Sequence, residues 1–253
     1  METHAHDLHK TPGHGWKHYF FEFFMLFLAV TLGFFVENIR ELLAEKQRAK
    51  VYASNLFNEL RNDTSSLNYL TAHNELTAEK LDTFCLLIKE KNKQPVTSGM
   101  LYYYGSAATN VVYFSPHNAT FEELKSSGNL RIMGNEMADK LSEYNNNIMM
   151  LDREYGLGKT EFEKIEDLHF KIFDVYILEK MLPQSSDKKS PRDSVFSIND
   201  LPISTDPELM KEYAGRLKFA ANIYRFETRE YLNPIKKKAA ELLGLLRREY
   251  PVN

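Results

Sequence analysis

The chain has 253 residues, a formal net charge of -3 and a mean hydropathy of -0.44, which together allow one or two domains that are water-soluble outside a single apolar segment. This near-balanced charge disfavours nucleic acid as a partner, because nucleic acids select strongly basic surfaces. Cys85 is the only cysteine, so an intramolecular disulfide is excluded.

Residues 1–18 are predicted to form a flexible tail that holds five of the eight histidines. The turn-prone run from Pro12 to Gly15 argues against a fixed set of metal ligands. Transition-metal binding and a pH-sensitive contact near a membrane remain alternative roles for these imidazoles. The five histidines are His4, His6, His9, His14 and His18.

Residues 19–36 are apolar except for Glu22 and Thr31, and they predict a transmembrane helix. A helix of this length rises about 27 Å at ~1.5 Å per residue, close to the ~30 Å hydrocarbon core of a bilayer. The run is too long for a secretory signal and no small-residue cleavage pattern follows it, so we expect an uncleaved anchor in the lipid bilayer.

One side of this predicted span combines small residues with charged ones. Ala29 and Gly33 form a small-xxx-small pair, which lets helices approach closely in lipid and predicts a homo-oligomer. A carboxylate at membrane depth is costly, so Glu22 either reaches the head groups, lies at a helix contact, lines an ion or proton path, or has no special role. At helical spacing, the predicted helix contact or pore comprises Glu22, Leu26, Ala29, Gly33, Glu37 and Arg40.

The charges that flank the span leave its orientation open. Counted naively, the positive-inside rule places the large domain in the cytoplasm, because more cations follow the span than precede it. Acidic residues are interleaved with the cations that follow, although they count little in this rule. The cations are Lys10 and Lys17 before the span, and Arg40, Lys46, Arg48 and Lys50 after it.

No Gly or Pro occurs between Gly33 and Pro95, so we expect the span to continue as a long helix. A strict 4-3 spacing of mostly apolar residues predicts a seam on this helix that packs against other helices. Its polar members Asp63, Asn74 and Thr77 either fix the register or oligomer state or are solvated at the edge of the bundle. The seam comprises Leu56, Leu60, Asp63, Leu67, Leu70, Asn74, Thr77, Leu81, Phe84 and Ile88.

A small irregular or short-strand insert is predicted near residues 99–117, where two tyrosine- and valine-rich runs are either short strands or a capping helix. Thr120 and Glu123 are typical of a capping box at the start of the next helix, and Gly128 is typical of its end. A second long helix is expected from about residue 135 to residue 182, with an interruption near Gly156 and Gly158.

A loop is predicted over residues 183–206, which lie between the second helix and a third. Asp206 is expected to cap the third helix and Pro207 to begin it, with its end near Tyr250 and a kink at Pro234. The predicted fold is therefore all-α, a transmembrane helix that continues into an antiparallel bundle over residues 37–253. If the second helix returns toward the membrane, the loop cations Lys188, Lys189 and Arg192 lie near the lipid surface.

Side chains with catalytic or metal-binding potential are sparse. Glu166 and His169 form a Glu-x-x-His unit, the half-motif that di-iron bundles use twice, but a second copy is missing, so a solvated helix face is favoured. His73 and His117 have no neighbouring nucleophile with an orienting acid. We therefore expect no catalytic residue, no bound metal and no cofactor.

Two stretches carry a resemblance to a known family. The first is the anchor, with Glu22, Ala29, Gly33, Asn38 and Glu41. The second comprises the run from Thr120 to Leu124, the run from Ser127 to Leu130, and Tyr144 with Asn145. Together they resemble the Thr-Phe-Glu-Glu-Leu and Ser-Gly-Asn-Leu signature of a domain of unknown function in single-span membrane proteins of Bacteroidota. The resemblance implies a bacterial inner-membrane anchor with the helical domain in the periplasm, and it implies no activity or cofactor.

The expected function is that of a non-enzymatic, membrane-anchored helical protein that self-associates and serves as a scaffold, sensor or partner-binding module. A homo-oligomeric ion or proton channel with Glu22 facing the pore is the alternative from another class. An enzyme that uses Glu166 and His169 is a third, less favoured class.

Overall fold

The structure, a computed structural model, describes residues 15–90, 95–177, 195–204 and 206–252. Internal contacts divide the chain into two units, residues 1–51 and 52–253. Every regular element in these ranges is helical, apart from one isolated bridge between Phe173 and Ile203, so the predicted all-α class is confirmed. The tail as far as His14 and the loop cations Lys188, Lys189 and Arg192 lie outside the described residues.

The first unit is the N-terminal part of α1 (Trp16–Lys89), which is helical from before the predicted span through Val51. Helix α1 is long and apolar enough to cross a membrane, by length and composition. The Thr31 hydroxyl donates a hydrogen bond to the Phe27 carbonyl at 2.8 Å, which satisfies this hydroxyl within the helix itself. The predicted long N-terminal helix is confirmed.

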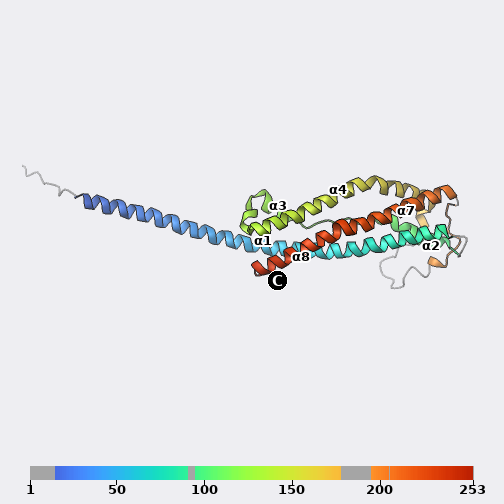
Figure 1. The fold of residues 1–253 in the computed structure, drawn as a ribbon, viewed down its shortest axis with the longest axis horizontal. Coiled ribbons are helices and arrows are strands. Elements are labelled where there is room, and N and C mark those ends of the chain that lie inside the picture. The colour runs from blue at the N-terminus through green and yellow to red at the C-terminus, as the bar shows by residue number, and fades with distance from the viewer. Residues whose placement is uncertain (1–14, 91–94, 178–194, 205, 253) are drawn as a thin grey trace, which may run out of the picture. The chain divides into compact units, whose positions relative to one another are not determined.

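The second unit begins at Tyr52 in α1 and contains the remaining elements (Figure 1). They are α2 (Ser98–Gly105), the 3-10 helix η1 (Ser106–Thr109), α3 (Ala119–Ser126), the 3-10 helix η2 (Asn129–Met133), α4 (Asn135–Ile172), α7 (Pro207–Glu227), the π-helical turn η3 (Thr228–Leu232) and α8 (Asn233–Glu249).

Within this unit α4 runs parallel to α1, which corrects the expectation that the second long helix returns along the first. Near the start of α4, the Tyr144 hydroxyl lies 2.8 Å from the Asp63 carboxylate. Just beyond the end of α4, the Phe173 ring packs against that of Phe84, with centroids 6.4 Å apart. Residue numbers therefore rise in the same direction along both helices.

The extended segment of residues 110–118 makes the parallel arrangement possible. At one end, the Asn110 carbonyl lies 3.1 Å from Nε2 of His73, and at the other end His117 contacts Asp63. The segment thus runs back along α1, and α3 and η2 then turn the chain into α4. A parallel pair of helices needs such a return, and here irregular chain supplies it.

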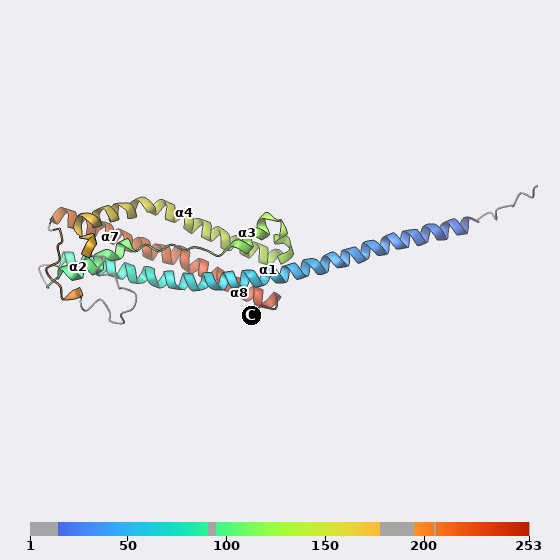
Figure 2. The ribbon, with the colours of Figure 1, turned by 180° about the vertical axis from the view of Figure 1, so that it is seen from behind.

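Helices α7 and α8 run antiparallel to both α1 and α4 (Figures 1 and 2). Along α7, the contact between Cys85 and Ala214 is followed by one between Asn74 and Glu227. The three long elements lie side by side, so each presents one face to a common core. The antiparallel part of the predicted bundle is confined to this last helical pair.

The seam predicted on α1 supplies the α1 side of that core. Its apolar members are fully buried as far as Phe84, and Ile88 is partly buried. Asp63, Asn74 and Thr77 are buried as well, at 0%, 1% and 4% exposure. The prediction that these three side chains are solvated at the bundle edge is therefore wrong. Buried polar groups need hydrogen-bond partners within the protein.

Two predicted helix ends are confirmed, and one predicted helix interruption is wrong. Gly128 has φ +70° just beyond α3, the left-handed geometry that ends a helix. The Asp206 carboxylate accepts hydrogen bonds from two backbone N–H groups at the start of α7. Helix α4, however, continues through Gly156 and Gly158, so the predicted interruption is wrong.

Pro234 does not end the C-terminal helix. The five residues before Asn233 form the π-helical turn η3, and the helix resumes as α8 with Pro234 in its first turn. A π-helical turn changes the hydrogen-bonding pattern next to the missing proline N–H, which lets helical structure continue. The π-helical turn therefore lies immediately before the position of the predicted kink.

Helix α2 is held by the chain segment of residues 195–204. Gly99 N–H donates to the Ile198 carbonyl at 3.0 Å, and the Thr97 hydroxyl donates to the Phe196 carbonyl at 2.8 Å. A Cβ on Gly99 would lie 1.9 Å from the Val195 carbonyl oxygen, so this contact requires glycine. Of the two alternatives for the predicted insert, residues 98–109 adopt the helix, and residues 110–118 are irregular.

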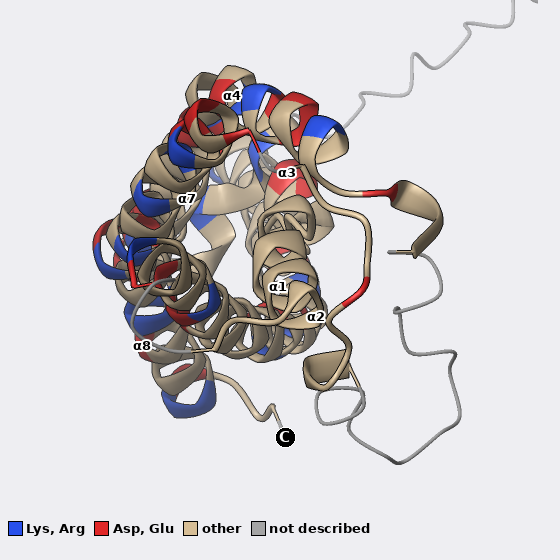
Figure 3. Ribbon diagram, turned by 90° about the vertical axis from the view of Figure 1, so that its right-hand side faces the viewer, with Lys and Arg blue, Asp and Glu red and all other residues tan. Residues whose placement is uncertain are grey.

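The charged residues of the second unit are of mixed sign. Figure 3 shows Lys and Arg interspersed with Asp and Glu along α4, α7 and α8. Several pairs bridge α4 to the last helices, among them Glu161 with Arg216 and Glu143 with Lys238, each at 2.6 Å. Pairs at or near the surface contribute little stability singly, but these two favour the antiparallel register of the two elements.

Candidate functional site

The predicted membrane face is helical and exposed. Glu22, Leu26, Ala29, Gly33, Glu37 and Arg40 all lie on α1, with side chains exposed in the isolated chain. Arg40 donates from Nε to Glu37 at 2.9 Å, so one ion pair lies on this face. Among the residues that the structure describes, no atom beyond the helix's own backbone lies within 4 Å of a Cβ built on Gly33. The face is thus available for another helix.

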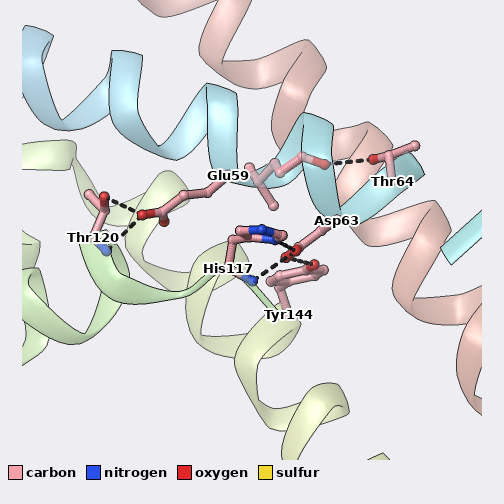
Figure 4. Close-up of polar contacts among 7 residues, drawn as sticks. Glu59, Asp63, Thr64, His117, Thr120 and Tyr144 are labelled. Carbon is pink, nitrogen blue, oxygen red and sulfur yellow. Dashed lines mark hydrogen bonds and ion pairs between the residues drawn. The ribbon is translucent and has the colours of Figure 1, made fainter. Parts of the chain in front are cut away.

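A buried polar site is centred on Asp63, a residue that the seam pattern singled out (Figure 4). Its carboxylate accepts three hydrogen bonds, from the backbone N–H and Nδ1 of His117 and from the Tyr144 hydroxyl, each at 2.8 Å. Asp63 is fully buried, whereas the His117 side chain is 51% exposed. The pKa of Tyr144 is raised, first by burial and then by the negative charge of Asp63. The site fastens the extended segment and α4 to α1.

A second carboxylate on α1 extends this site toward α3. Glu59 Oε1 accepts from the backbone N–H of Thr120 at 3.1 Å and from its hydroxyl at 2.7 Å (Figure 4). The predicted capping box is therefore wrong, because Thr120 lies inside α3 and uses its hydroxyl on Glu59. Glu123 accepts instead from the Tyr52 hydroxyl at 2.8 Å.

Two of the residues that carry the resemblance, Thr120 and Tyr144, lie at this site. Thr120 and Tyr144 bind the carboxylates of Glu59 and Asp63, and Gly128 provides the turn between α3 and η2. His117, which looks isolated in the sequence, is also part of this site. The partner of His117 is 54 positions away, so only the fold reveals the pair.

A second buried site surrounds Glu227, in the last turn of α7. Its Oε1 accepts from Nδ2 of Asn74 at 3.2 Å and from the Tyr155 hydroxyl at 3.1 Å. Glu227 is only 7% exposed, and burial is the main cause of its raised pKa, which the two hydrogen bonds partly offset. Asn74 thus joins α1 to α7, while Tyr155 joins α4 to α7. Sequence reasoning gave no signal for Glu227.

The Glu-x-x-His unit on α4 does not form a site. Glu166 is exposed, whereas His169 is fully buried and points to Tyr213 on α7, with Nδ1 2.8 Å from the hydroxyl. The expectation of a solvated face is therefore wrong for His169. Burial lowers its pKa to about 4, so the imidazole is neutral near pH 7. No group of three or more His, Cys, Asp or Glu side chains suited to a metal occurs among the residues that the structure describes.

Cys85 is half-buried and donates from Sγ to the Ala214 carbonyl at 3.2 Å. Burial raises its pKa to about 11, so the thiol is mostly protonated at neutral pH and a weak nucleophile. Its place is that of a small packing residue between α1 and α7.

The fold and its sites define an all-α bundle with an apolar N-terminal helix and two buried carboxylate sites that tie its segments together. Comparison with family models, with curated proteins and with solved structures finds no match to this chain.

Proposed function

We propose that this chain is a membrane-anchored protein that self-associates through α1 and uses its second unit as a scaffold, sensor or partner-binding module. The observation that carries the proposal is the exposed apolar surface of α1, in whose most apolar window no residue is buried. Water disfavours such a surface, whereas lipid accommodates it. Lipid is therefore the proposed surrounding of residues 19–36.

Self-association is proposed through the face that holds Ala29 and Gly33. Small side chains allow two helices to approach closely in lipid, where packing rather than apolar bulk decides which faces meet. Glu22 and the Glu37–Arg40 pair lie on the same face, so a partner helix would also shield or bind these charges. The family resemblance supports a bacterial inner membrane, with the second unit in the periplasm.

The anchor is tested by extracting membranes of expressing cells with alkaline carbonate. We expect the full-length chain to remain in the membrane pellet. Release into the supernatant would remove the proposed anchor.

Self-association is tested by single-molecule photobleaching of the labelled full-length chain in bilayers. The Ala29→Leu/Gly33→Leu double variant should raise the dissociation constant of the oligomer at least about 10-fold, equivalent to ~1.4 kcal/mol. A Phe24→Leu/Phe35→Leu variant changes the opposite side of the helix and should leave the oligomer intact. Equal effects of the two variants would contradict a contact through the small residues. The alternative function is tested in liposomes. If the chain conducts ions and Glu22→Gln abolishes that flux, a channel replaces the binding module as the proposed function.

A further inference from the structure

A cavity of about 370 Å³ opens beside the Glu227 site, between α4, the end of α7 and the extended segment. Its volume falls in the range of small-molecule sites. The cavity is lined mostly by aromatic and aliphatic side chains, and the exposed rings of Phe219 and Phe226 form part of its rim. Such exposed rings favour an occupant that carries apolar surface.

The aromatic walls are arranged in pairs from different elements. The rings of Tyr113 and Tyr155 have centroids 4.8 Å apart, and those of Phe162 and Tyr224 have centroids 5.7 Å apart. One pair joins the extended segment to α4, and the other joins α4 to α7. Aromatic faces of this kind attract cations as well as apolar groups.

The charge of the cavity is negative. Glu154, Glu161 and Glu227 line it, and no Lys, Arg or His is among its described lining residues. Glu161 is neutralised from outside the cavity by Arg216 at 2.6 Å. Glu227 has no such cation, because its partners within the described chain are the amide of Asn74 and the hydroxyl of Tyr155.

One carboxylate oxygen at the cavity lacks a partner among the residues that the structure describes. Glu227 accepts both of its hydrogen bonds on Oε1, which leaves Oε2 available. Tyr224 also lines the cavity, but its hydroxyl is buried away from it and has no hydrogen-bond partner among the described residues. An unpaired carboxylate oxygen such as Oε2 attracts a charged N–H donor.

We propose that this cavity binds a small apolar molecule that carries a protonated amine. The ammonium group donates to Oε2 of Glu227, and the aromatic walls receive the apolar body. The inference rests on the binding role proposed above for the second unit, but it does not depend on the anchor or on self-association.

The test uses the detergent-solubilised full-length chain at pH 8 and three probes of one shape, 4-phenylbutylamine, 4-phenylbutan-1-ol and 4-phenylbutanoate. Isothermal titration measures affinity, and saturation-transfer NMR reports which probe protons contact the protein. We expect the amine to bind at least about 10-fold more tightly than the alcohol, and the carboxylate not to bind, because of the negative cavity.

Two matched pairs of variants locate the site. Glu227→Gln keeps the acceptor for Asn74 and Tyr155 but removes the charge, and should weaken the amine at least about 10-fold while sparing the alcohol. Glu208→Gln makes the same change at an exposed position of α7 and should have no effect. Gly158→Leu fills the cavity and should abolish binding of amine and alcohol, whereas Gly156→Leu, on the same helix but outside the cavity, should abolish neither.

Equal affinity for amine and alcohol, or amine binding that survives Glu227→Gln, would overturn the proposed chemistry. If the alcohol still binds in either of these outcomes, the proposed binding role of the second unit is retained. Binding that Gly158→Leu does not affect would place the ligand elsewhere and overturn the site. Carbonate extraction tests the membrane anchor separately, so its result does not depend on ligand binding.

Discussion

The buried imidazole of His169 shows how one residue couples the fold to pH. The Tyr213 hydroxyl donates its hydrogen to the Gly105 carbonyl at 3.0 Å, so it accepts from His169, whose Nδ1 must carry the proton. Nε2 is then an unprotonated nitrogen, buried without a partner in the described part of the chain. Protonation would create a buried, unpaired N–H, which accounts for the lowered pKa.

This arrangement predicts a loss of stability in acid. The folded chain keeps His169 neutral down to about pH 4, whereas the unfolded chain binds the proton below pH 6.5, so the contribution is complete above pH 6.5 and is lost as the pH falls toward 4. His169→Gln removes the titration and keeps an N–H donor for Tyr213. Relative to this variant, the wild type should lose about 2 kcal/mol of unfolding free energy between pH 7 and pH 4.5. Urea titrations at both pH values measure it, and a constant difference would contradict the assignment.

At this scale the sequence identifies positions better than partners. The 4-3 spacing correctly placed Asp63 and Asn74 on the buried seam, but spacing along one helix carries no information about His117, Tyr144 or Glu227. The capping-box prediction failed for the same reason. Thr120 has a local acceptor in its sequence motif, yet the fold brings a better-placed carboxylate from α1.

At the scale of elements, the contact between α2 and the segment of residues 195–204 depends on Gly99. Gly99→Ala forces its Cβ against the Val195 carbonyl, so the segment must move and the Gly99–Ile198 hydrogen bond should weaken. We expect a loss of about 2 kcal/mol or more in unfolding free energy, measured by urea denaturation. Gly215→Ala, at an open position of α7, should instead stabilise the chain by about 0.5–1 kcal/mol through helix propensity. Stabilisation by both substitutions would rule out the close contact.

Helix ends that depend on local chemistry were predictable, as at Gly128, Asp206 and Pro207. Helix interruptions that tertiary packing can override were not predictable. A glycine within a helix costs only about 1 kcal/mol, so the packed face of α4 carries the helix through Gly156 and Gly158. Pro234 is accommodated by the π-helical turn before it.

At the scale of the whole second unit, the direction of α4 escaped the sequence analysis. An apolar seam shows that a helix packs, but it does not show which helix it meets or in which direction. The short connections expected between helices favour antiparallel neighbours, whereas here the extended segment of residues 110–118 returns along α1 first. The Asp63 site holds that segment in place, so the buried carboxylate contributes to the parallel topology.

The parallel order of α1 and α4 is testable by distances between spin labels in a Cys85→Ala background. Labels at the exposed positions Asn62 and Asn146 flank the Asp63–Tyr144 hydrogen bond, so we expect a short separation. Labels at Asn62 and Lys171 should lie much farther apart, because the intervening part of α4 rises roughly 35 Å at about 1.5 Å per residue. Double electron–electron resonance on the solubilised full-length chain measures both distances. An antiparallel pair would reverse their order, and the Asp63 site could then not join the two helices.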